Sequence, residues 1–279
     1  MTEDSRSGAG KGAQRHDLDE AAWISSPLAR RRVASPNFGV RRGERGIDMI
    51  VLHYTGCPSA ESALLWMCSH DSQVSAHYLV DEDGEIVQLV DERARAWHAG
   101  VACWAGETDI NSCSIGIEIQ NMGHAAEGGL PPYPEAQIAA VIALCRDIMA
   151  RHGIVPTRVV GHSDVAPARK CDPGEHFPWA RLAEAGVAVH VPEDAVPVPA
   201  AAEAALGPGE EGDAVAAMQA DLAAIGYCPP QTGRFCEETQ VVVRAFQRRF
   251  RPSRVDGLAD AHTLVLARRV RELMTGAVA

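Results

Sequence analysis

The strand that decides the fold lies in residues 47–56, which read Ile47-Asp48-Met49-Ile50-Val51-Leu52-His53-Tyr54-Thr55-Gly56. A short apolar run that stops at a glycine-ended turn is typical of a strand in the core of a sheet. His53 follows the run directly. A histidine at the carboxyl end of a core strand is well placed to face a cleft.

Strands and helices alternate after this run. The turn Asp81-Glu82-Asp83-Gly84 separates two apolar runs and predicts a hairpin. Strands are predicted at 76–80, 85–90, 114–120 and 155–160, and helices at 59–69 and 134–152. This order predicts an α/β domain with a mixed central β-sheet flanked by helices.

Composition divides the chain into four segments. Residues 1–20 are polar and predict a flexible N-terminus. Residues 21–186 contain the α/β pattern, and residues 187–211 are rich in Ala, Pro and Gly, as a linker is. Residues 212–279 carry three helical patterns, near 213–225, 237–249 and 261–274, and predict a small all-α three-helix domain.

Bulk composition narrows the class of protein and its location. The 279 residues are 46% hydrophobic and 23% charged, and the formal charge of −11 argues against a nucleic-acid partner. No apolar run is long enough for a transmembrane segment, and the first twenty residues lack the apolar core of an export signal. Eight scattered cysteines favour reduced thiols and a cytoplasmic enzyme. A misassigned start would leave a periplasmic location as the alternative.

Three residues have the chemistry of zinc ligands: His53 after the first core strand, His162 after the last, and Asp172 in the loop beyond. Three nitrogen or oxygen donors with a fourth position open for water are typical of a catalytic zinc site. Spacing alone leaves packed or surface roles open, because the chain has eleven histidines.

Glu118 interrupts the apolar run Ile115-Gly116-Ile117-Glu118-Ile119. Period-two alternation puts its side chain on the face opposite Ile117 and Ile119. The carboxylate could face solvent, or it could point into the cleft and act as a general base.

Lys170 is one of only two lysines among 26 basic residues. Arginine supplies nearly all of the positive charge, so a lysine beside a candidate ligand suggests a need for a compact ammonium rather than a planar guanidinium. Chance codon use is the alternative.

Six segments in this order resemble the zinc-dependent N-acetylmuramoyl-L-alanine amidases of the AmpD and AmiD type. They span about 130 residues and comprise 50–55 (IVLHYT), 74–80 (VSAHYLV), 83–88 (DGEIVQ), 96–100 (AWHAG), 111–118 (NSCSIGIE) and 161–174 (GHSDVAPARKCDPG). The resemblance implies a single zinc held by His53, His162 and Asp172, and hydrolysis of the amide between N-acetylmuramic acid, or its 1,6-anhydro form, and L-alanine. It also implies Glu118 as the group that orients water and shuttles its proton, and Lys170 as the stabiliser of the tetrahedral intermediate.

Neighbouring residues receive weaker assignments. By resemblance His77, Trp97 and His98 line the cleft as candidate substrate contacts, although they could simply pack beneath it. Tyr54, Asn111 and Arg169 flank the expected ligands or the base and are candidates to hold sugar or peptide groups. Asp164 is expected to cap a loop or support a ligand rather than bind the metal. Cys171 is the alternative to Asp172 as third ligand, but the register before Pro173-Gly174 favours Asp172.

Residues 213–264 resemble the small helical peptidoglycan-binding module often fused to wall hydrolases, although Gly257-Leu258-Ala259-Asp260 lacks an expected second glycine. A module that serves stability or dimerisation is the alternative. The expected partner is peptidoglycan or a muropeptide, in cell-wall turnover or recycling. A non-catalytic peptidoglycan-recognition protein and a phage-type endolysin remain the competing functions.

Overall fold

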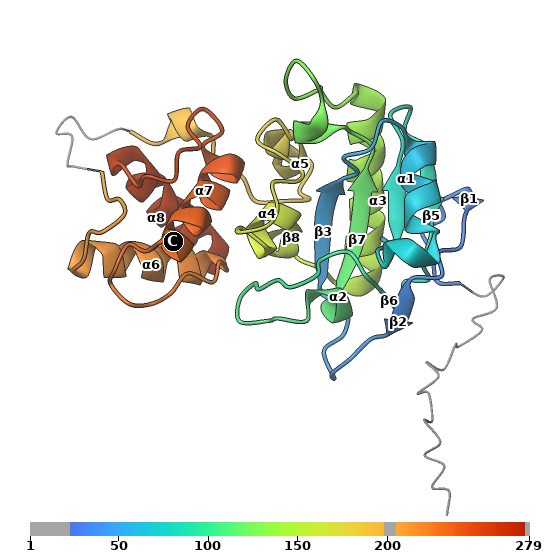
Figure 1. Ribbon diagram of the computed structural model, residues 1–279, viewed down its shortest axis with the longest axis horizontal. Coiled ribbons are helices and arrows are strands. Elements are labelled where there is room, and N and C mark those ends of the chain that lie inside the picture. Colours follow the sequence, from blue (N-terminus) through green and yellow to red (C-terminus); the bar gives the residue numbers. More distant parts are fainter. Residues whose placement is uncertain (1–22, 198–204, 277–279) are drawn as a thin grey trace, which may run out of the picture.

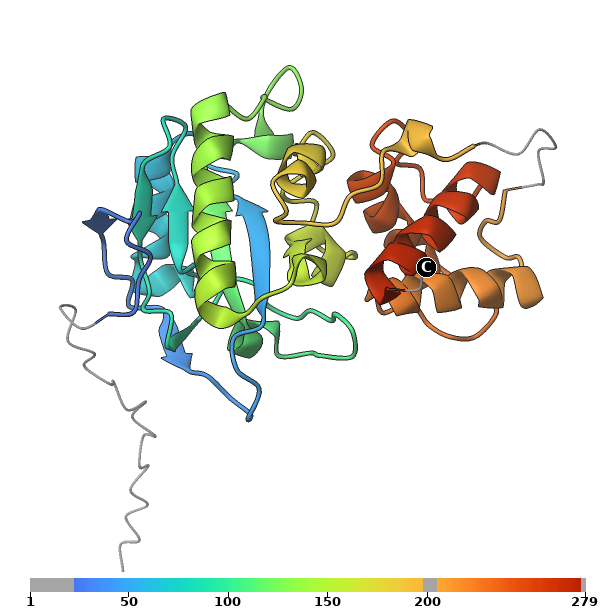
Figure 2. The same ribbon diagram turned by 180° about the vertical axis from the view of Figure 1, so that it is seen from behind.

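The computed structural model describes residues 23–197 and 205–276. The N-terminus expected to be flexible, residues 1–20, lies outside the described residues, as does the middle of the expected linker. Two units lie side by side in views from opposite sides (Figure 1, Figure 2): an α/β unit of residues 23–197 and a helical unit of residues 205–276. The last residues of the first unit, 191–197, lie against the helical unit. The predicted fold class is confirmed.

Six strands form the central sheet in the order β1-β5-β4-β7-β3-β8. The middle strand β3 is parallel to both β7 and β8, whereas β4 and β5 form the predicted antiparallel hairpin. Two short strands, β2 and β6, pair separately. The bounds are β1 (Arg31–Arg32), β2 (Phe38–Val40), β3 (Met49–Tyr54), β4 (Tyr78–Val80), β5 (Ile86–Gln88), β6 (Ala94–Ala96), β7 (Ser114–Ile119) and β8 (Val159–Gly161).

Alternation along β3 sends its side chains into two different cores. Ile50 and Leu52 pack with α3 (Glu135–His152), which lies along one face of the sheet (Figure 2). Met49 and Val51 point the other way, into a core that continues into the helical unit. Both faces of β3 are therefore buried, which is why its sequence is an almost unbroken apolar run.

Helices cover the rest of the sheet. On the face opposite α3, α1 (Ala60–Met67) packs over the hairpin strands β4 and β5. The remaining helical segments of the α/β unit are short: α2 (Ile110–Cys113), α4 (His162–Val165), α5 (Trp179–Glu184), η2 (His70–Ser72), η3 (Gly123–Ala125), η4 (Pro156–Arg158) and η5 (Glu193–Ala195). Within residues 23–197 and 205–276, no helix combines the length and apolar character needed to cross a bilayer.

The helical unit contains the three predicted helices, α6 (Asp213–Ile225), α7 (Glu237–Phe250) and α8 (Ala261–Thr275). Asp260 caps the start of α8, because its side chain accepts from the Thr263 backbone N–H. The unit does not stand apart from the sheet. Its apolar residues form one continuous core with Met49, Val51 and Val160 of the α/β unit.

The first part of the expected linker is packed. Val187 and Ala188 lie in the core between the sheet and α3, while Val191 and Val196 belong to the core shared with the helical unit. Glu193, in η5, is also held from the helical unit, since Ser253 donates to its carboxylate and His262 to its carbonyl. Residues 187–197 therefore differ from a free spacer, because their valines supply enough apolar surface to anchor them.

A disulfide joins the two units. Cys103, in the loop before α2, is bonded to Cys228, which follows Tyr227 in the helical unit. The expectation that every cysteine is a reduced thiol is wrong for this pair, whereas the other six cysteines are free. The two residues are 125 positions apart, so their spacing gave no sign of pairing.

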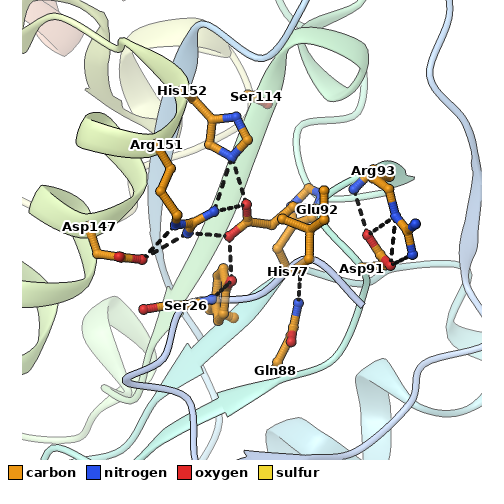
Figure 3. Close-up of polar contacts among 12 residues, drawn as sticks. Ser26, His77, Gln88, Asp91, Glu92, Arg93, Ser114, Asp147, Arg151 and His152 are labelled. Carbon is orange, nitrogen blue, oxygen red and sulfur yellow. Dashed lines mark hydrogen bonds and ion pairs between the residues drawn. The ribbon is translucent and has the colours of Figure 1, made fainter. Parts of the chain in front are cut away.

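Figure 3 shows a buried ionic cluster that fastens α3 to the hairpin side of the sheet. The Glu92 carboxylate is fully buried and accepts from Arg151 and His152 at the end of α3 and from the Tyr78 hydroxyl. Tyr78 in turn accepts from the Ser26 backbone N–H at 2.8 Å. Burial disfavours the ionised carboxylate, but these hydrogen bonds outweigh it and lower the pKa of Glu92 to about 2.

Glu92→Gln is expected to lower the free energy of unfolding by about 3 kcal/mol at neutral pH, at 1.36 kcal/mol per pKa unit. The folded pKa of Glu92 lies below its unfolded value. Its stabilisation is therefore complete above the unfolded pKa of about 4.5 and is lost as the pH falls towards about 2. Urea unfolding between pH 7 and pH 3 should show the gap between wild type and variant narrowing below pH 4.5. Glu135→Gln, which breaks an exposed pair with Arg181, is the control and should change little. A gap that stays constant with pH would contradict this role for Glu92.

Candidate functional site

The carboxyl ends of β3, β7 and β8 meet at one edge of the sheet, where three of the candidate residues lie. His53 in β3 pairs in register with Glu118 in β7. His162 is the first residue of α4, directly after β8. In open α/β sheets this edge is where ligands and catalytic groups collect. Parallel pairing thus brings together two histidines that are 109 positions apart.

Asp172 joins the two histidines in a compact group of donor atoms. His53 Nδ1 lies 2.9 Å from His162 Nδ1, and Asp172 Oδ2 lies 3.1 Å and 3.0 Å from these two nitrogens. All three residues are buried. Among the described residues this is the one group of His, Cys, Asp and Glu donors that could hold a metal ion, and Cys171 is not part of it.

The Nε2 atoms of His53 and His162, which point away from Asp172, each have a hydrogen-bond partner. His162 Nε2 donates to the Ala99 carbonyl at 3.1 Å. His53 Nε2 lies 3.1 Å from His98 Nδ1, and His98 Nε2 lies 3.1 Å from the Ser114 hydroxyl, which donates to the Ile110 carbonyl. These contacts leave the Nδ1 lone pairs of His53 and His162 facing the common point. Such outer partners set the tautomer of a metal-binding histidine and raise its basicity.

Electrostatics suit the group to bind a cation. Burial, with the neighbouring His162, lowers the pKa of His53 to about 4, so its ring is neutral at pH 7 and can act as a ligand. For Asp172, burial disfavours the charge, but His162 and His53 outweigh it and hold its pKa well below the usual range. The site thus presents the neutral imidazole of His53 and the ionised carboxylate of Asp172 beside the ring of His162.

Glu118 has a different environment from Asp172. Its Oε2 is buried and has no hydrogen-bond partner in residues 23–197 and 205–276. Burial, reinforced by the negative charge of Asp172, raises the pKa of Glu118 well above its usual value. An unpartnered carboxylate oxygen beside a cluster of ligand atoms is the chemistry of a proton acceptor awaiting a water or substrate. Of the two positions open from the sequence, the structure has the one facing the cleft.

A cavity of about 400 Å³ opens over these groups. His53, Glu118, His162 and Asp172 lie at its base. Lys170 also lines it, and no hydrogen bond or ion pair of its ammonium occurs in the part of the chain that the structure describes. An ammonium without a fixed partner is free to meet negative charge that develops in the cavity.

The other predicted residues divide between the cavity wall and its support. Tyr54, Trp97, His98 and Arg169 line the cavity. Tyr54 contacts His124 at 3.1 Å, and Arg169 donates to the carbonyls of Ala99 and Val101.

His77 and Asn111 are buried and do not line this cavity. The Gly116 N–H donates to His77 Nδ1, while Asn111 Oδ1 accepts from the backbone N–H groups of His98 and Ala99. Direct contact of these two residues with substrate stays a prediction.

One wall of the cavity, formed by α1 and the segment after it, was not predicted from the sequence. Trp66 is 56% exposed there, beside Met67 and Val74. The exposure of Trp66 could have been suspected from the sequence, because this residue falls outside the apolar face of the helix predicted at 59–69. Without the fold, nothing in the sequence connected it to His53.

The donor set fits a metal ion. Two imidazole nitrogens and one carboxylate oxygen converge, and Glu118, which has a buried and unpartnered carboxylate oxygen, lines the same cavity. This is the His/His/carboxylate composition of hydrolytic zinc sites, which keep a fourth position open.

Family models match both units of the chain. Residues 43–175 match the family described as N-acetylmuramoyl-L-alanine amidase, and residues 211–266 match a peptidoglycan binding domain. The N-acetylmuramoyl-L-alanine amidase AmiD of Escherichia coli K12 is 40% identical over 238 residues, which cover 81% of this chain and 83% of the relative. The 1,6-anhydro-N-acetylmuramyl-L-alanine amidase AmpD of Citrobacter freundii is 33% identical over 59% of this chain and 92% of its own length.

Solved structures agree over most of the chain. The complex of Escherichia coli AmiD with anhydro-N-acetylmuramic acid-L-Ala-D-γ-Glu-L-Lys has a TM-score of 0.68 at 38% identity, and the match covers 84% of this chain and 93% of that one. AmpDh3 of Pseudomonas aeruginosa has a TM-score of 0.67 at 30% identity, over 90% of this chain and 98% of that one. Shared fold and identity at this level together place this chain in the N-acetylmuramoyl-L-alanine amidase family.

Proposed function

We propose that this chain hydrolyses the amide bond between N-acetylmuramic acid, or its 1,6-anhydro form, and the L-alanine that begins the stem peptide. The observation that carries the proposal is that His53, His162 and Asp172 line one cavity together with Glu118, whose carboxylate has an unpartnered oxygen. The AmiD complex with an anhydro-muramyl tripeptide supports this choice of substrate class.

His53, His162 and Asp172 would hold one zinc ion. Bound there, zinc supplies Lewis-acid chemistry that lowers the pKa of a coordinated water towards about 7 and polarises the scissile carbonyl. Glu118 accepts a proton from the attacking water and returns it to the leaving nitrogen as the C–N bond breaks. Lys170 stabilises the negative charge that develops on the carbonyl oxygen.

The cavity walls would hold the two ends of the substrate. Trp97 and Trp66 offer aromatic surface for the apolar face of a sugar, and Tyr54 and Arg169 offer hydrogen-bond donors. His98 supports His53 through its ring nitrogen. We assign His77 and Asn111 to the same site through the backbone groups that they hold.

The two units take different parts in this function. Residues 21–186 form the amidase domain and residues 212–279 the peptidoglycan-binding-like domain, with residues 187–211 between them. Of the two expected locations, the Cys103–Cys228 disulfide supports the periplasmic one, because structural disulfides form in oxidising compartments and rarely in the cytoplasm.

Chelation and metal restoration test the activity. The full chain, stripped with a chelator, should stop releasing the L-alanine-headed peptide from an anhydro-muramyl peptide, as measured by mass spectrometry. One equivalent of zinc should restore release, and magnesium should not, because nitrogen donors select zinc. Tight binding of the muramyl peptide without cleavage by the zinc-loaded protein would instead favour the non-catalytic recognition function.

A further inference from the structure

We propose that the helical unit positions the metal ligand His162, acting through Arg249 and Tyr227, which together hold the carboxylate of Asp164. The inference rests on the proposed function in one respect, that His162 binds the metal. It assigns to the C-terminal unit a part in building the active site, separate from any binding of peptidoglycan. Arg249 and Tyr227 are positioning residues, since neither lines the catalytic cavity.

Asp164 lies at the contact between the two units. Its side chain is 1% exposed and accepts three hydrogen bonds. Tyr227 donates its hydroxyl to Oδ1 at 2.7 Å, while Arg249 Nη1 donates to Oδ2 at 2.7 Å and the Gly161 backbone N–H to Oδ2 at 2.8 Å. Two of the three donors come from the helical unit. A buried carboxylate needs such partners, and removing one leaves charge uncompensated.

Arg249 is buried, and both of its terminal nitrogens donate hydrogen bonds to the α/β unit. It lies near the end of α7, and this helix packs beside α4 of the α/β unit (Figure 1). Its side chain is 2% exposed, its guanidinium stacks on Trp179 with Cζ 4.2 Å from the ring centre, and Nη2 donates to the Val159 carbonyl at 3.1 Å. Three directed hydrogen bonds, to Asp164, Val159 and Val189, and the contact with the Trp179 ring call for a guanidinium rather than an ammonium.

Tyr227 is fixed by the covalent and apolar contacts around it. The next residue is Cys228, bonded to Cys103, and the Tyr227 ring packs edge-on against Trp104 with centroids 5.0 Å apart. A Cβ on Gly226 would lie 2.5 Å from the Trp104 ring, so only glycine permits this approach. The Tyr227 hydroxyl is therefore delivered to Asp164 with little freedom to move.

Asp164 transmits this support to two metal ligands. Its bond to the Gly161 N–H closes the first turn of α4, which begins with His162. The backbone N–H of Ser163, the residue after His162, donates to the carbonyl of Asp172 at 2.8 Å. A shift of Asp164 therefore moves both His162 and Asp172. Donor positions at a zinc site must hold to within a few tenths of an ångström.

Metal affinity in the full chain tests the inference. Arg249→Met and Tyr227→Phe are expected to raise the zinc dissociation constant about tenfold and about threefold, near the lower end of the effects seen for groups that orient metal ligands. Competition with a chromophoric chelator measures the constant. The visible spectrum of the cobalt-substituted protein should change in both variants. Arg249→Lys, which keeps the charge, should restore part of the affinity.

Arg251→Met is the matched control. Arg251 is a buried arginine of the same segment, but it pairs with Asp260 inside the helical unit. Its replacement should lower stability and leave zinc affinity and the cobalt spectrum as in wild type. Should Arg249→Met not fold, Tyr227→Phe, which removes one hydroxyl, decides the matter. Unchanged zinc affinity and cobalt spectrum in Tyr227→Phe, and in Arg249→Met where it folds, would overturn the inference.

Wild-type activity separates this inference from the proposed function. If wild type binds zinc and its affinity depends on Arg249 and Tyr227, the positioning stands even where no muramyl peptide is cleaved. If wild type cleaves the peptide but both variants keep wild-type affinity and spectrum, the positioning fails and the amidase function stands. If Arg249 and Tyr227 do position His162, kcat should fall in the variants while KM stays near that of wild type.

Discussion

Glu118→Gln is expected to lower kcat by roughly 10²- to 10⁴-fold, the range that a positioned general base contributes. The amide keeps the shape of the carboxylate but cannot take a proton from water. Because Glu118 is not part of the donor group of His53, His162 and Asp172, the variant should still bind one zinc ion. Peptide release followed by mass spectrometry gives kcat, and elemental analysis gives the metal content.

The Glu135→Gln variant is the control for Glu118. Glu135 is also a glutamate, but it lies on the surface at the start of α3, paired with Arg181 far from the cavity lining. It should turn over substrate as wild type does. Substantial turnover by Glu118→Gln at full zinc occupancy would remove Glu118 from the mechanism and leave the metal site as proposed.

Asp172→Ala is expected to weaken zinc binding by more than about 100-fold, beyond the range seen for groups outside the ligand shell, and to abolish activity. The change removes one of three donors and leaves two imidazoles. Cys171→Ala should bind zinc as wild type does, since the thiol is not among the converging atoms. His162→Ala should behave as Asp172→Ala does. Chelator competition on the full-length variants measures each constant.

The two variants Asp172→Ala and Cys171→Ala together decide which residue is the third ligand. Asp172 and Cys171 both line the cavity, and either side chain is chemically able to bind zinc. If Cys171→Ala lost the metal and Asp172→Ala kept it, the ligand set inferred from the geometry would be wrong. Far-ultraviolet circular dichroism should show the same fold for both.

Long periodic segments were predictable because local chemistry marks their ends. α6 stops at Gly226 and α8 starts at the capping Asp260, and both helices begin where the pattern places them. By contrast, β1, β2 and β6 hold only two or three residues each, too few for a periodicity to emerge. β8 begins at Val159, later than expected, because Pro156 opens a turn of 3₁₀ helix instead.

The residues of the candidate site also divide into those that the sequence could reveal and those that only the fold brings together. His53, His162 and Glu118 could be found because each belongs to or follows a buried strand, and parallel strands end at one edge of a sheet. Trp66 on the opposite wall needed the packing of α1 over the sheet before it could be connected to them. The contact of Asp164 with Arg249 joins residues 85 positions apart in different units, and no local pattern encodes it.

The disulfide between Cys103 and Cys228 also makes the covalent chain a ring between those two positions. A protease that cuts any single peptide bond between residues 104 and 227 would produce a nicked molecule, with both fragments still attached. Such a product should migrate as intact protein in a gel without reductant and as two bands with it. An amidase of this kind, working outside the cytoplasm as proposed above, would survive a cut between its units without shedding the helical one.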